Sequence, residues 1–590
     1  MTDQTGWLRR HRNLLTALLL MLAAWTIYLP SVRYGFVYYD DVRILLNHPE
    51  LYGQANLSAD MREIFVTSFP REEPLLLRDV SWALDSKLFG FGNAFGYHLG
   101  NVLLHGIVVA LMFAFLLGTT RRYGFALAVS IAWLVLAIHT EPVDWIMGRK
   151  DILSTLFMLL ALCTQTRRLA TKDFRAECVW YAVTLVCFLC GLFSKISVLT
   201  FPFVLFLHAV FLPYLNGERP ANAAFAWGRS LVKELLLFVP AFVASILVYG
   251  WYGRILSQMG VLDRGYTAHG LAHLWNLLMI DPLVICVYVQ QTFLPCHLKV
   301  LYTWPEILTT YPLWQVATSI AFVIMAGGLG VWLFRRHKDF FFYYASFFLI
   351  MVPYMNLVFS GIYVAERYLY FSVFCLLALA VTVVASILQR PQPVWRGGAL
   401  AGGACFVILN LFQTFSYQPA WRNGETLWQY HLTLPRPSPT SYANLAAYYY
   451  ADATAKVGTP QMAVPMSKMS VVVDAGLAQF WPDHGQPPPP DIYFLFFLKS
   501  IVQEVGGEPE AALASLLTSD SLHPNFDSTS LNLARLYRKL SKAAVDPKQK
   551  MTYARDAQDR FAEYIALAFR GRPAPPDVQK EFEDIKADAK

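Results

Sequence analysis

Charged residues are scarce in this sequence, and their scarcity excludes an ordinary soluble protein. Of the 590 residues, 15% are Asp, Glu, Lys or Arg and 56% are hydrophobic, whereas soluble domains average about 25% charged residues. Most of the chain is therefore expected to be surrounded by lipid rather than water. The formal net charge is only +7, and we expect no nucleic-acid partner.

Cysteine is missing from both ends of the chain, which argues against a disulfide framework. All eight cysteines lie between Cys163 and Cys405, inside or beside apolar stretches, where they are expected to pack as small hydrophobic residues. Zinc-ligand spacings, a P-loop, a GxSxG elbow and a nucleotide-binding glycine pattern are also missing from suitable contexts. Soluble nucleotide sugars are therefore not favoured as substrates.

Apolar runs that predict membrane spans follow one another as far as residue 417. They occupy about 14–30, 99–118, 123–138, 152–165, 178–193, 196–214, 235–252, 312–334, 340–360, 368–388 and 398–417. Basic clusters such as Arg121-Arg122 and Arg335-Arg336 punctuate alternate connections. Placing these clusters in the cytoplasm satisfies the positive-inside rule with about eleven spans, an uncleaved first span and a cytoplasmic N-terminus.

The segment 270–296 tests this topology. Asp281-Pro282 interrupts an otherwise apolar stretch, and counting the stretch as a span would move Arg335-Arg336 to the outside. We therefore interpret the segment as an interfacial or re-entrant element on the outer face.

Two adjacent carboxylates, Asp40-Asp41 in FVYYDDVRILLN, open the predicted first external loop, residues 31–97. Successive side chains point in different directions, so separate tasks are expected. Asp40 is the candidate general base, and Asp41 supports it or binds a divalent metal such as Mg²⁺ or Mn²⁺. The alternative is a solvated loop, or a helix N-terminus that favours anions. Amphipathic helices are predicted at Ser58–Phe69 and Asp79–Leu88.

Ionisable residues also gather at the predicted outer ends of the spans, where their cost at membrane depth favours a functional role. HTEPVDWIMGRKD contributes His139, Glu141, Arg149 and Lys150, FSKIS contributes Lys195, and VAERYLYFS contributes Glu366, Arg367 and Tyr370. The alternative is an internal ion pair, Glu366 with an arginine, that only holds helices together. His98, Asn101 and His105 share one helix face, which either meets substrate or forms interhelical hydrogen bonds.

These groups would suit the transfer of a sugar from a lipid phosphate to a hydroxyl group. The attacking hydroxyl needs one base, which a carboxylate supplies. Charge that develops on the phosphate leaving group needs cations aimed at it. A single displacement of this kind inverts the anomeric centre.

The composition becomes more polar after residue 417 and predicts an external domain, 418–590, behind a membrane domain, 1–417. YANLAAYY and SLNLARLY resemble each other, and residues 493–526 have the length of one tetratricopeptide unit, with a Gly506-Gly507 turn between two helices. About three degenerate helical pairs are expected to stack into a small curved array. The array either cradles a polypeptide or a partner, or caps the membrane domain.

The chain resembles the transmembrane-and-tetratricopeptide-repeat family of type C glycosyltransferases, which is related to protein O-mannosyltransferases. The resemblance is carried by FVYYDDVRILLN, SWALDSKLFGFGNAFGYHLGNVLLH, HTEPVDWIMGRKDILS, FSKISVLTFPFVLF, VAERYLYFS and WRNGETLWQYHLTLPRPSP. It implies an all-α polytopic membrane fold with an external repeat domain. It also implies a polyprenyl- or dolichyl-phosphate sugar donor, typically of mannose, and a Ser/Thr acceptor on an exported protein.

The resemblance further implies roles for individual residues. Asp40 and Asp41 match the acidic pair of the family's first external loop. The family's basic positions, which are expected near the lipid phosphate, match Arg149, Lys150, Lys195 and Arg367. The residues expected to contact substrate are His98, Asn101, His105, His139, Glu141, Glu366, Tyr370 and Arg78. Relatives often have Arg-Pro-Leu where this chain has Glu73-Pro74-Leu75, and this departure predicts a difference in substrate if that arginine binds donor or acceptor.

Two alternatives stay open. One is a related enzyme that glycosylates a lipid or a glycan, and the other is a transporter or assembly scaffold without catalytic activity. Ionisable residues at the outer ends of helices, rather than in mid-span, favour an enzyme over a transporter. The short, compact tail favours a bacterial inner membrane, with the C-terminal domain in the periplasm, over the membrane of the endoplasmic reticulum.

Overall fold

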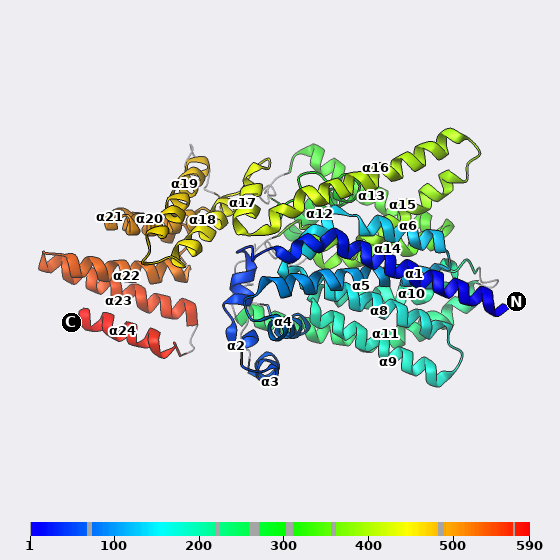
Figure 1. Cartoon of the computed structure of the whole chain (residues 1–590), viewed down its shortest axis with the longest axis horizontal. Helices are drawn as coiled ribbons and strands as arrows, with labels where there is room; N and C mark the ends of the chain where they lie inside the picture. Colours follow the sequence, from blue (N-terminus) through cyan, green and yellow to red (C-terminus); the bar gives the residue numbers. More distant parts are fainter. Residues whose placement is uncertain are drawn as a thin grey trace. The chain divides into compact units, whose positions relative to one another are not determined.

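The structure, a computed structural model, is all-α. It describes residues 2–67, 73–218, 223–258, 271–302, 311–355, 362–481, 489, 491–524, 526–569 and 573–589. Regular structure in these ranges is entirely helical (Figure 1), which confirms the predicted fold class. The chain divides into two compact units, Met1–Asn423 and Gly424–Lys590, close to the change in composition after residue 417.

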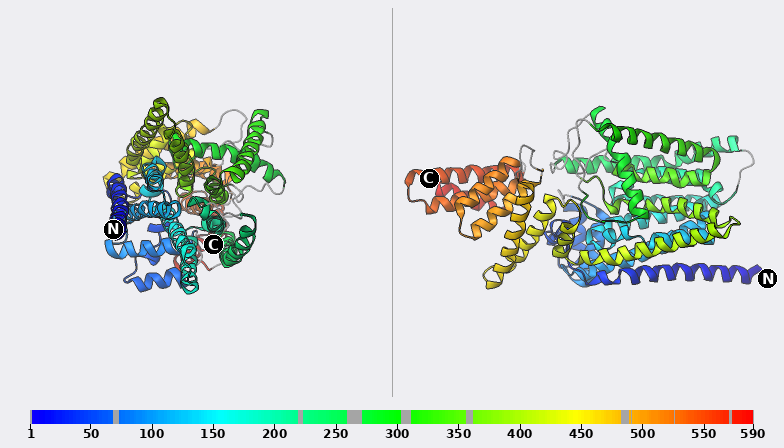
Figure 2. Two further views of the ribbon diagram at one scale, coloured as in Figure 1. Left: turned by 90° about the vertical axis from the view of Figure 1, so that its right-hand side faces the viewer. Right: turned by 90° about the horizontal axis from the view of Figure 1, so that it is seen from above.

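The first unit has the helices of a multi-pass membrane protein, and its long helices run roughly parallel to one another (Figure 2). Eight described helices, with their flanking turns, are long and apolar enough to cross a membrane. They are α1 (Thr2–Tyr28), α5 (Ala94–Thr120), α9 (Phe174–Ser194), α10 (Phe201–Leu215), α11 (Ala223–Gln258), α12 (Leu271–Phe293), α13 (Leu313–Arg336) and α16 (Pro393–Tyr417). A ninth crossing forms if α6 (Tyr123–Leu134) and residues 137–144, bent by 58°, act together.

Three of the predicted spans fold as helices that do not meet this criterion. α8 (Arg149–Ala170) carries charged residues in its first and last turns. α14 (Lys338–Met351) has 14 residues and α15 (Val373–Leu388) has 16, fewer than the ~20 that a perpendicular span needs. All three pack against neighbouring helices of the same unit: α8 against α5 and α9, α14 against α10, and α15 against α6. They therefore belong to the helical bundle that the sequence predicted.

One end of this bundle collects the basic residues of alternate helix connections. Arg121 pairs with Glu218 at 2.8 Å, and Lys338 donates to the Tyr214 hydroxyl at 3.2 Å. We call this end the basic end and define it by Arg121, Arg168, Lys233, Arg335, Arg336 and Lys338. The opposite end, which carries Asp40-Asp41 and the first turn of α8, is the site end.

α12 is one continuous helix, so the predicted interruption at Asp281-Pro282 is wrong: Pro282 lies inside the helix. Asn276, in its first half, accepts a hydrogen bond from Tyr311 just before α13. Tyr302, in the segment that follows α12, donates to Glu366 at the site end. α13 begins next to Tyr311 and ends at the basic end, so Tyr311 lies toward the site end. Both ends of α12 are therefore tied to the site end, although the helix is long enough to cross a membrane.

The second unit, Gly424–Lys590, is a stack of helical pairs. α18 (Pro439–Thr454) packs on α19 (Ala463–Phe480), α20 (Ile492–Val505) on α21 (Pro509–Leu522), and α22 (Asp527–Ala543) on α23 (Pro547–Phe569), with α17 (Gly424–Thr433) before them and α24 (Pro576–Asp588) after them. Gly506-Gly507 joins α20 to α21, and Gly507 has a φ of 81°, which glycine adopts without steric cost. The three expected pairs are present.

The last pair depends on one aromatic side chain, Phe561, which is fully buried with Ala557 and Ile585 and stacks on Phe582 at 5.5 Å. Phe561→Ala is expected to lower the local free energy of unfolding by about 3–5 kcal/mol, because it removes buried surface and leaves a cavity. Amide hydrogen exchange over 527–589 in the full-length protein measures this loss. Val545→Ala, at a side chain that is 97% exposed, is the control. Equal exchange in the two variants contradicts the packing of α22–α24.

Candidate functional site

A sharp elbow between α6 and α8 builds the site end. It consists of a short turn, α7 (Thr140–Asp144), a second turn at 146–148 and the first residue of α8, Arg149. Gly148 makes the elbow feasible, because a Cβ at this position would overlap the carbonyl of Pro142. The start of α8 thus approaches the backbone of α7 more closely than a side chain permits.

Arg149 fixes this elbow to α4 (Leu76–Phe89) and α5. Its side chain is only 1% exposed, and its guanidinium nitrogens donate to four acceptors. These are the Asn101 side chain at 2.5 Å, the Ser81 hydroxyl at 3.1 Å, the Asp85 carboxylate at 2.7 Å and the Tyr97 carbonyl at 2.7 Å. We therefore interpret Arg149 as a clasp between elements, an alternative to its predicted role as a ligand of the donor phosphate.

Lys150 and Arg78 belong to a second ion-pair network at the same end. Both donate to Glu73, at 2.7 and 2.6 Å, and Arg78 also pairs with Asp79 at 2.9 Å. Burial alone would raise the pKa of the Glu73 carboxyl, but the two cations outweigh it and lower the pKa to about 2. Lys150 uses one of its three N–H donors on Glu73, whereas Arg78 is buried between Glu73 and Asp79. Glu73, the departure from the family motif, thus pairs with two residues predicted to bind substrate or phosphate.

The acidic pair opens a short π-helical segment, Asp41–Leu46. The half-buried Asp40 pairs with Arg43 at 2.9 Å. Asp41 is 1% exposed; its Oδ2 accepts the Val37 N–H at 3.0 Å, and its Oδ1 has no partner in the described ranges. Burial and, more weakly, the charge of Asp40 raise the pKa of Asp41 to about 7, against the Val37 hydrogen bond. The two carboxylates face different surroundings, as the alternation of side chains predicts.

Trp145 links the acidic pair to Arg367. The ring of Tyr39, the residue before Asp40, lies 5.6 Å from the Trp145 ring. The Arg367 guanidinium lies 5.3 Å from the centre of the same Trp145 ring, within the ~6 Å of a cation–π contact. The indole therefore lies between the ring of Tyr39, which precedes Asp40 in the sequence, and the Arg367 guanidinium.

The row of rings continues to a second cation. Arg367 lies 5.1 Å from the Tyr368 ring, which stacks on Tyr354 at 4.3 Å. The Lys195 ammonium lies 4.9 Å from the Tyr354 ring and 5.4 Å from the Tyr368 ring. We call Tyr39, Trp145, Tyr368 and Tyr354 the aromatic row. It joins the acidic pair to Arg367 and Lys195, which come from separate parts of the chain.

Each of these two cations is paired on one side and keeps a little exposure. Arg367 Nη1 pairs with Glu141, whose other oxygen accepts the Arg367 N–H at 2.8 Å; the Nε and Nη2 groups have no acceptor among the described residues. Lys195 pairs with Asp151. Arg367 is 6% and Lys195 8% exposed. A cavity of about 20 Å³ beside them, lined by Asp151, Ser197 and Arg367, has room for one water molecule.

The predicted histidine face of α5 turns inward. His105 Nδ1 lies 2.7 Å from the Tyr370 hydroxyl, and the Asn101 amide donates to the Trp145 carbonyl at 2.9 Å. The His98 ring nitrogen Nε2 lies 3.3 Å from the Gly35 carbonyl. Of the two interpretations left open by the sequence, interhelical hydrogen bonding fits these contacts, whereas contact with substrate does not.

His139 and Glu366 are buried as well. His139 packs 4.1 Å from the Trp133 ring. Glu366 accepts hydrogen bonds from the Lys299 N–H and the Tyr302 hydroxyl, both at 2.7 Å. The alternative of an ion pair between Glu366 and an arginine is not seen among the described residues, and the adjacent Arg367 pairs with Glu141. The His139 and Glu366 side chains are thus enclosed by the protein, whereas Tyr370 also lines the small cavity beside Arg367.

The described side chains offer few ligands for a bound metal ion. Where residues are described, no group of three or more His, Cys, Asp or Glu side chains is arranged to hold a metal ion. Asp40 and Asp41 face different partners, so they offer no shared pair of ligands.

Sequence reasoning missed several residues of the site. Asp85, the acceptor of Arg149, lies four residues after Ser81 in a predicted amphipathic helix, and that spacing on one helix face was a usable signal. Tyr354 stands in an apolar run rich in aromatic residues. In such runs a ring that meets a cation has no signature that distinguishes it from one that meets lipid.

The fold and these buried charges define an all-α, multi-pass membrane protein with a helical-repeat unit, and comparison with known proteins places it further. The chain is 31% identical over 175 residues to protein O-mannosyl-transferase Tmtc1 of Drosophila melanogaster, a match covering 28% of this chain and 20% of the relative. It is 30% identical over 223 residues to protein O-mannosyl-transferase TMTC1 of Mus musculus, a match covering 35% of this chain and 23% of the relative. It is 25% identical over 260 residues to protein O-mannosyl-transferase TMTC3 of Homo sapiens, a match covering 40% of this chain and 27% of the relative.

These matches confirm the resemblance that the motifs indicated. The matched region spans about a fifth to a quarter of the length of these curated relatives. No family model matches the sequence, and no solved structure matches it.

The buried pair Glu141–Arg367 yields a stability prediction. Glu141→Ala leaves the Arg367 charge buried without its partner, which is expected to cost about 3–5 kcal/mol and to lower the midpoint of thermal unfolding in detergent. Adding Arg367→Met to Glu141→Ala removes the uncompensated charge and is expected to restore most of the midpoint. A double variant no more stable than Glu141→Ala would contradict the pairing.

Proposed function

We propose that this protein is a membrane glycosyltransferase that moves mannose or another hexose from a polyprenyl-phosphate donor to a Ser/Thr hydroxyl of an exported protein. Its relatives are named protein O-mannosyl-transferases, which supports a sugar donor and a protein acceptor. The observation that carries the proposal is the aromatic row, which leads from Tyr39, beside the acidic pair in the sequence, to two largely buried cations, Arg367 and Lys195.

Asp40 acts as the general base in this proposal. It is the more accessible carboxylate of the pair, and it forms an ion pair with Arg43, whose side chain is itself largely exposed. The acceptor oxygen bonds to the anomeric carbon as the bond from that carbon to the phosphate oxygen breaks, and the hydroxyl proton passes to the Asp40 carboxylate. The other product is the polyprenyl phosphate, and the anomeric centre is inverted.

Arg367 and Lys195 stabilise the departing phosphate. The Arg367 nitrogens not used by Glu141 can donate to phosphate oxygens, in a site where burial strengthens such contacts. Lys195 supplies a second positive charge next to the Tyr354–Tyr368 stack. Arg149, Lys150 and Arg78 position the walls of the site and have no direct part in the reaction.

The first experiment compares intact masses of exported proteins from cells with wild-type protein, with Asp40→Asn and with the gene deleted. Loss of a general base lowers rates by about 10²–10⁴-fold, so a hexose-sized mass loss is expected in both altered strains. Glu50→Gln, a half-exposed carboxylate of the same loop, is the matched control. Unchanged protein masses in the deletion would move the acceptor to a lipid or a glycan, and a defect in the deletion alone would indicate a scaffold.

Asp41 gives the reaction a pH dependence. Its carboxyl is protonated below about pH 7 and ionised above it. The added negative charge beside Asp40 strengthens the attraction of Asp40 for the acceptor's proton, so kcat/KM is expected to rise through about pH 7. Initial rates measured in membranes between about pH 5.5 and about pH 8.5 follow this rise in kcat/KM. Asp41→Asn should abolish the rise and Asp41→Glu should keep one; a rise that persists in Asp41→Asn contradicts the assignment.

A further inference from the structure

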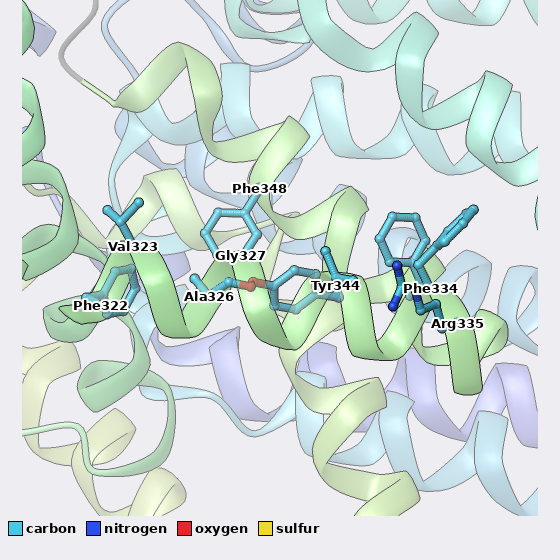
Figure 3. Close-up of a pocket in the computed structure, with 11 residues that line it drawn as sticks. Phe322, Val323, Ala326, Gly327, Phe334, Arg335, Tyr344 and Phe348 are labelled. Atoms are coloured by element: carbon cyan, nitrogen blue, oxygen red, sulfur yellow. The ribbon is translucent and has the colours of Figure 1, made fainter. Parts of the chain in front are cut away.

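A groove of about 730 Å³ runs between α13 and α14, remote from the aromatic row (Figure 3). α13 is among the least buried of the candidate spans, with 11% of its apolar window inside the protein, so this groove faces the surrounding lipid. Phe322, Val323, Phe334, Tyr344 and Phe348 are among the side chains that line it. The cavity lies within the size range of ligand sites, about 300–1,000 Å³.

Glycines keep the groove open. A Cβ at Gly327 would meet nothing within 4 Å, so the bare helix backbone forms part of the wall. The Tyr344 hydroxyl donates to the Ala326 carbonyl at 2.6 Å and thereby fixes its ring across α13, where a Cβ on Gly330 would approach the ring at 3.1 Å. The shape therefore comes from defined contacts between the two helices.

Positive charge stands at one end of the groove. Arg335 lines it, and Figure 3 shows the Arg335 guanidinium at the end opposite Phe322 and Val323. Arg335 and the adjacent Arg336 are exposed and have no carboxylate partner in the part of the chain that the structure describes. Other residues of the basic end do have one, since Arg121 pairs with Glu218 and Lys233 with Glu177.

We propose that this groove binds one anionic glycerophospholipid, with an acyl chain along Gly327 and the headgroup phosphate at Arg335-Arg336. An apolar channel that ends in two unpaired arginines complements a molecule with a hydrocarbon tail and an anionic head, and basic pockets between membrane helices bind such headgroups. A second protein helix fits less well. Bulky rings flank the open backbone, and an apolar helix would leave both arginines without an anion.

This site is separate from the proposed sugar donor, whose phosphate lies at Arg367 and Lys195 at the other end of the bundle. The bound phospholipid would brace α13, which has few protein contacts of its own, against α14. The inference therefore stands whether or not the chain transfers sugar.

The test is native mass spectrometry of the delipidated full-length protein with phosphatidylglycerol or phosphatidylcholine of matched acyl chains. Wild-type protein is expected to bind phosphatidylglycerol at least tenfold more tightly. Gly327→Leu fills the groove and is expected to weaken that binding at least fivefold. The double variant Arg335→Gln/Arg336→Gln should lose the preference for the anionic lipid while still accepting an acyl chain.

Matched controls come from α16, an equally exposed span. Gly402→Leu adds the same side chain at a glycine where a Cβ would meet nothing within 4 Å. Arg396→Gln removes one positive charge of α16, outside the groove. Both variants should bind lipid as wild type does. Equal affinity for the two lipids in wild-type protein would overturn the proposal. So would identical binding by Gly327→Leu and Gly402→Leu, or a wild-type dimer that Gly327→Leu dissociates, which would assign the groove to a second copy of the chain.

Discussion

Pairing of buried charge is the constraint on which the site end depends. A charged side chain that leaves water without a partner costs several kcal/mol, and at membrane depth water cannot easily follow it. The pairs here join elements far apart in the chain: Arg367 with Glu141, Lys195 with Asp151, and Arg149 with Asp85. Each pair ties one helix end to another. The contacts that hold the bundle together at this end are therefore the same contacts that position the candidate catalytic groups.

The completeness of each pairing separates supporting residues from candidate reacting ones. Arg149 has four acceptors and is buried, and these contacts hold the elbow in place. Arg367 pairs with Glu141 through one nitrogen of its side chain, and it remains slightly exposed beside the Trp145 ring. Asp41 anchors the loop through the Val37 N–H, while Asp40 stays accessible. A site of this kind is prepared for an anion and a hydroxyl before either arrives.

Much of the fold could be predicted from the sequence, because apolar runs and the Gly506-Gly507 turn report local preferences directly. The partners of buried charges could not be predicted. Glu366 and Arg367 are adjacent in sequence, yet Glu366 bonds to Tyr302 while Arg367 reaches Glu141, since neighbouring side chains point in different directions. Pro282 was expected to interrupt a helix, but α12 continues through it, because packing can offset the loss of one backbone hydrogen bond. Such outcomes depend on contacts between distant segments.

The most direct measurement of the central claim follows purified protein that is supplied with mannose-labelled polyprenyl phosphate and a Ser/Thr-rich acceptor protein. Transferred mannose and released polyprenyl phosphate are counted together. The account predicts equal amounts of the two in the wild-type reaction and neither in Asp40→Asn, while Glu50→Gln reacts like wild type. Transfer from a nucleotide sugar alone, or full transfer by Asp40→Asn, would contradict a site in which the acidic pair activates the acceptor opposite a lipid phosphate.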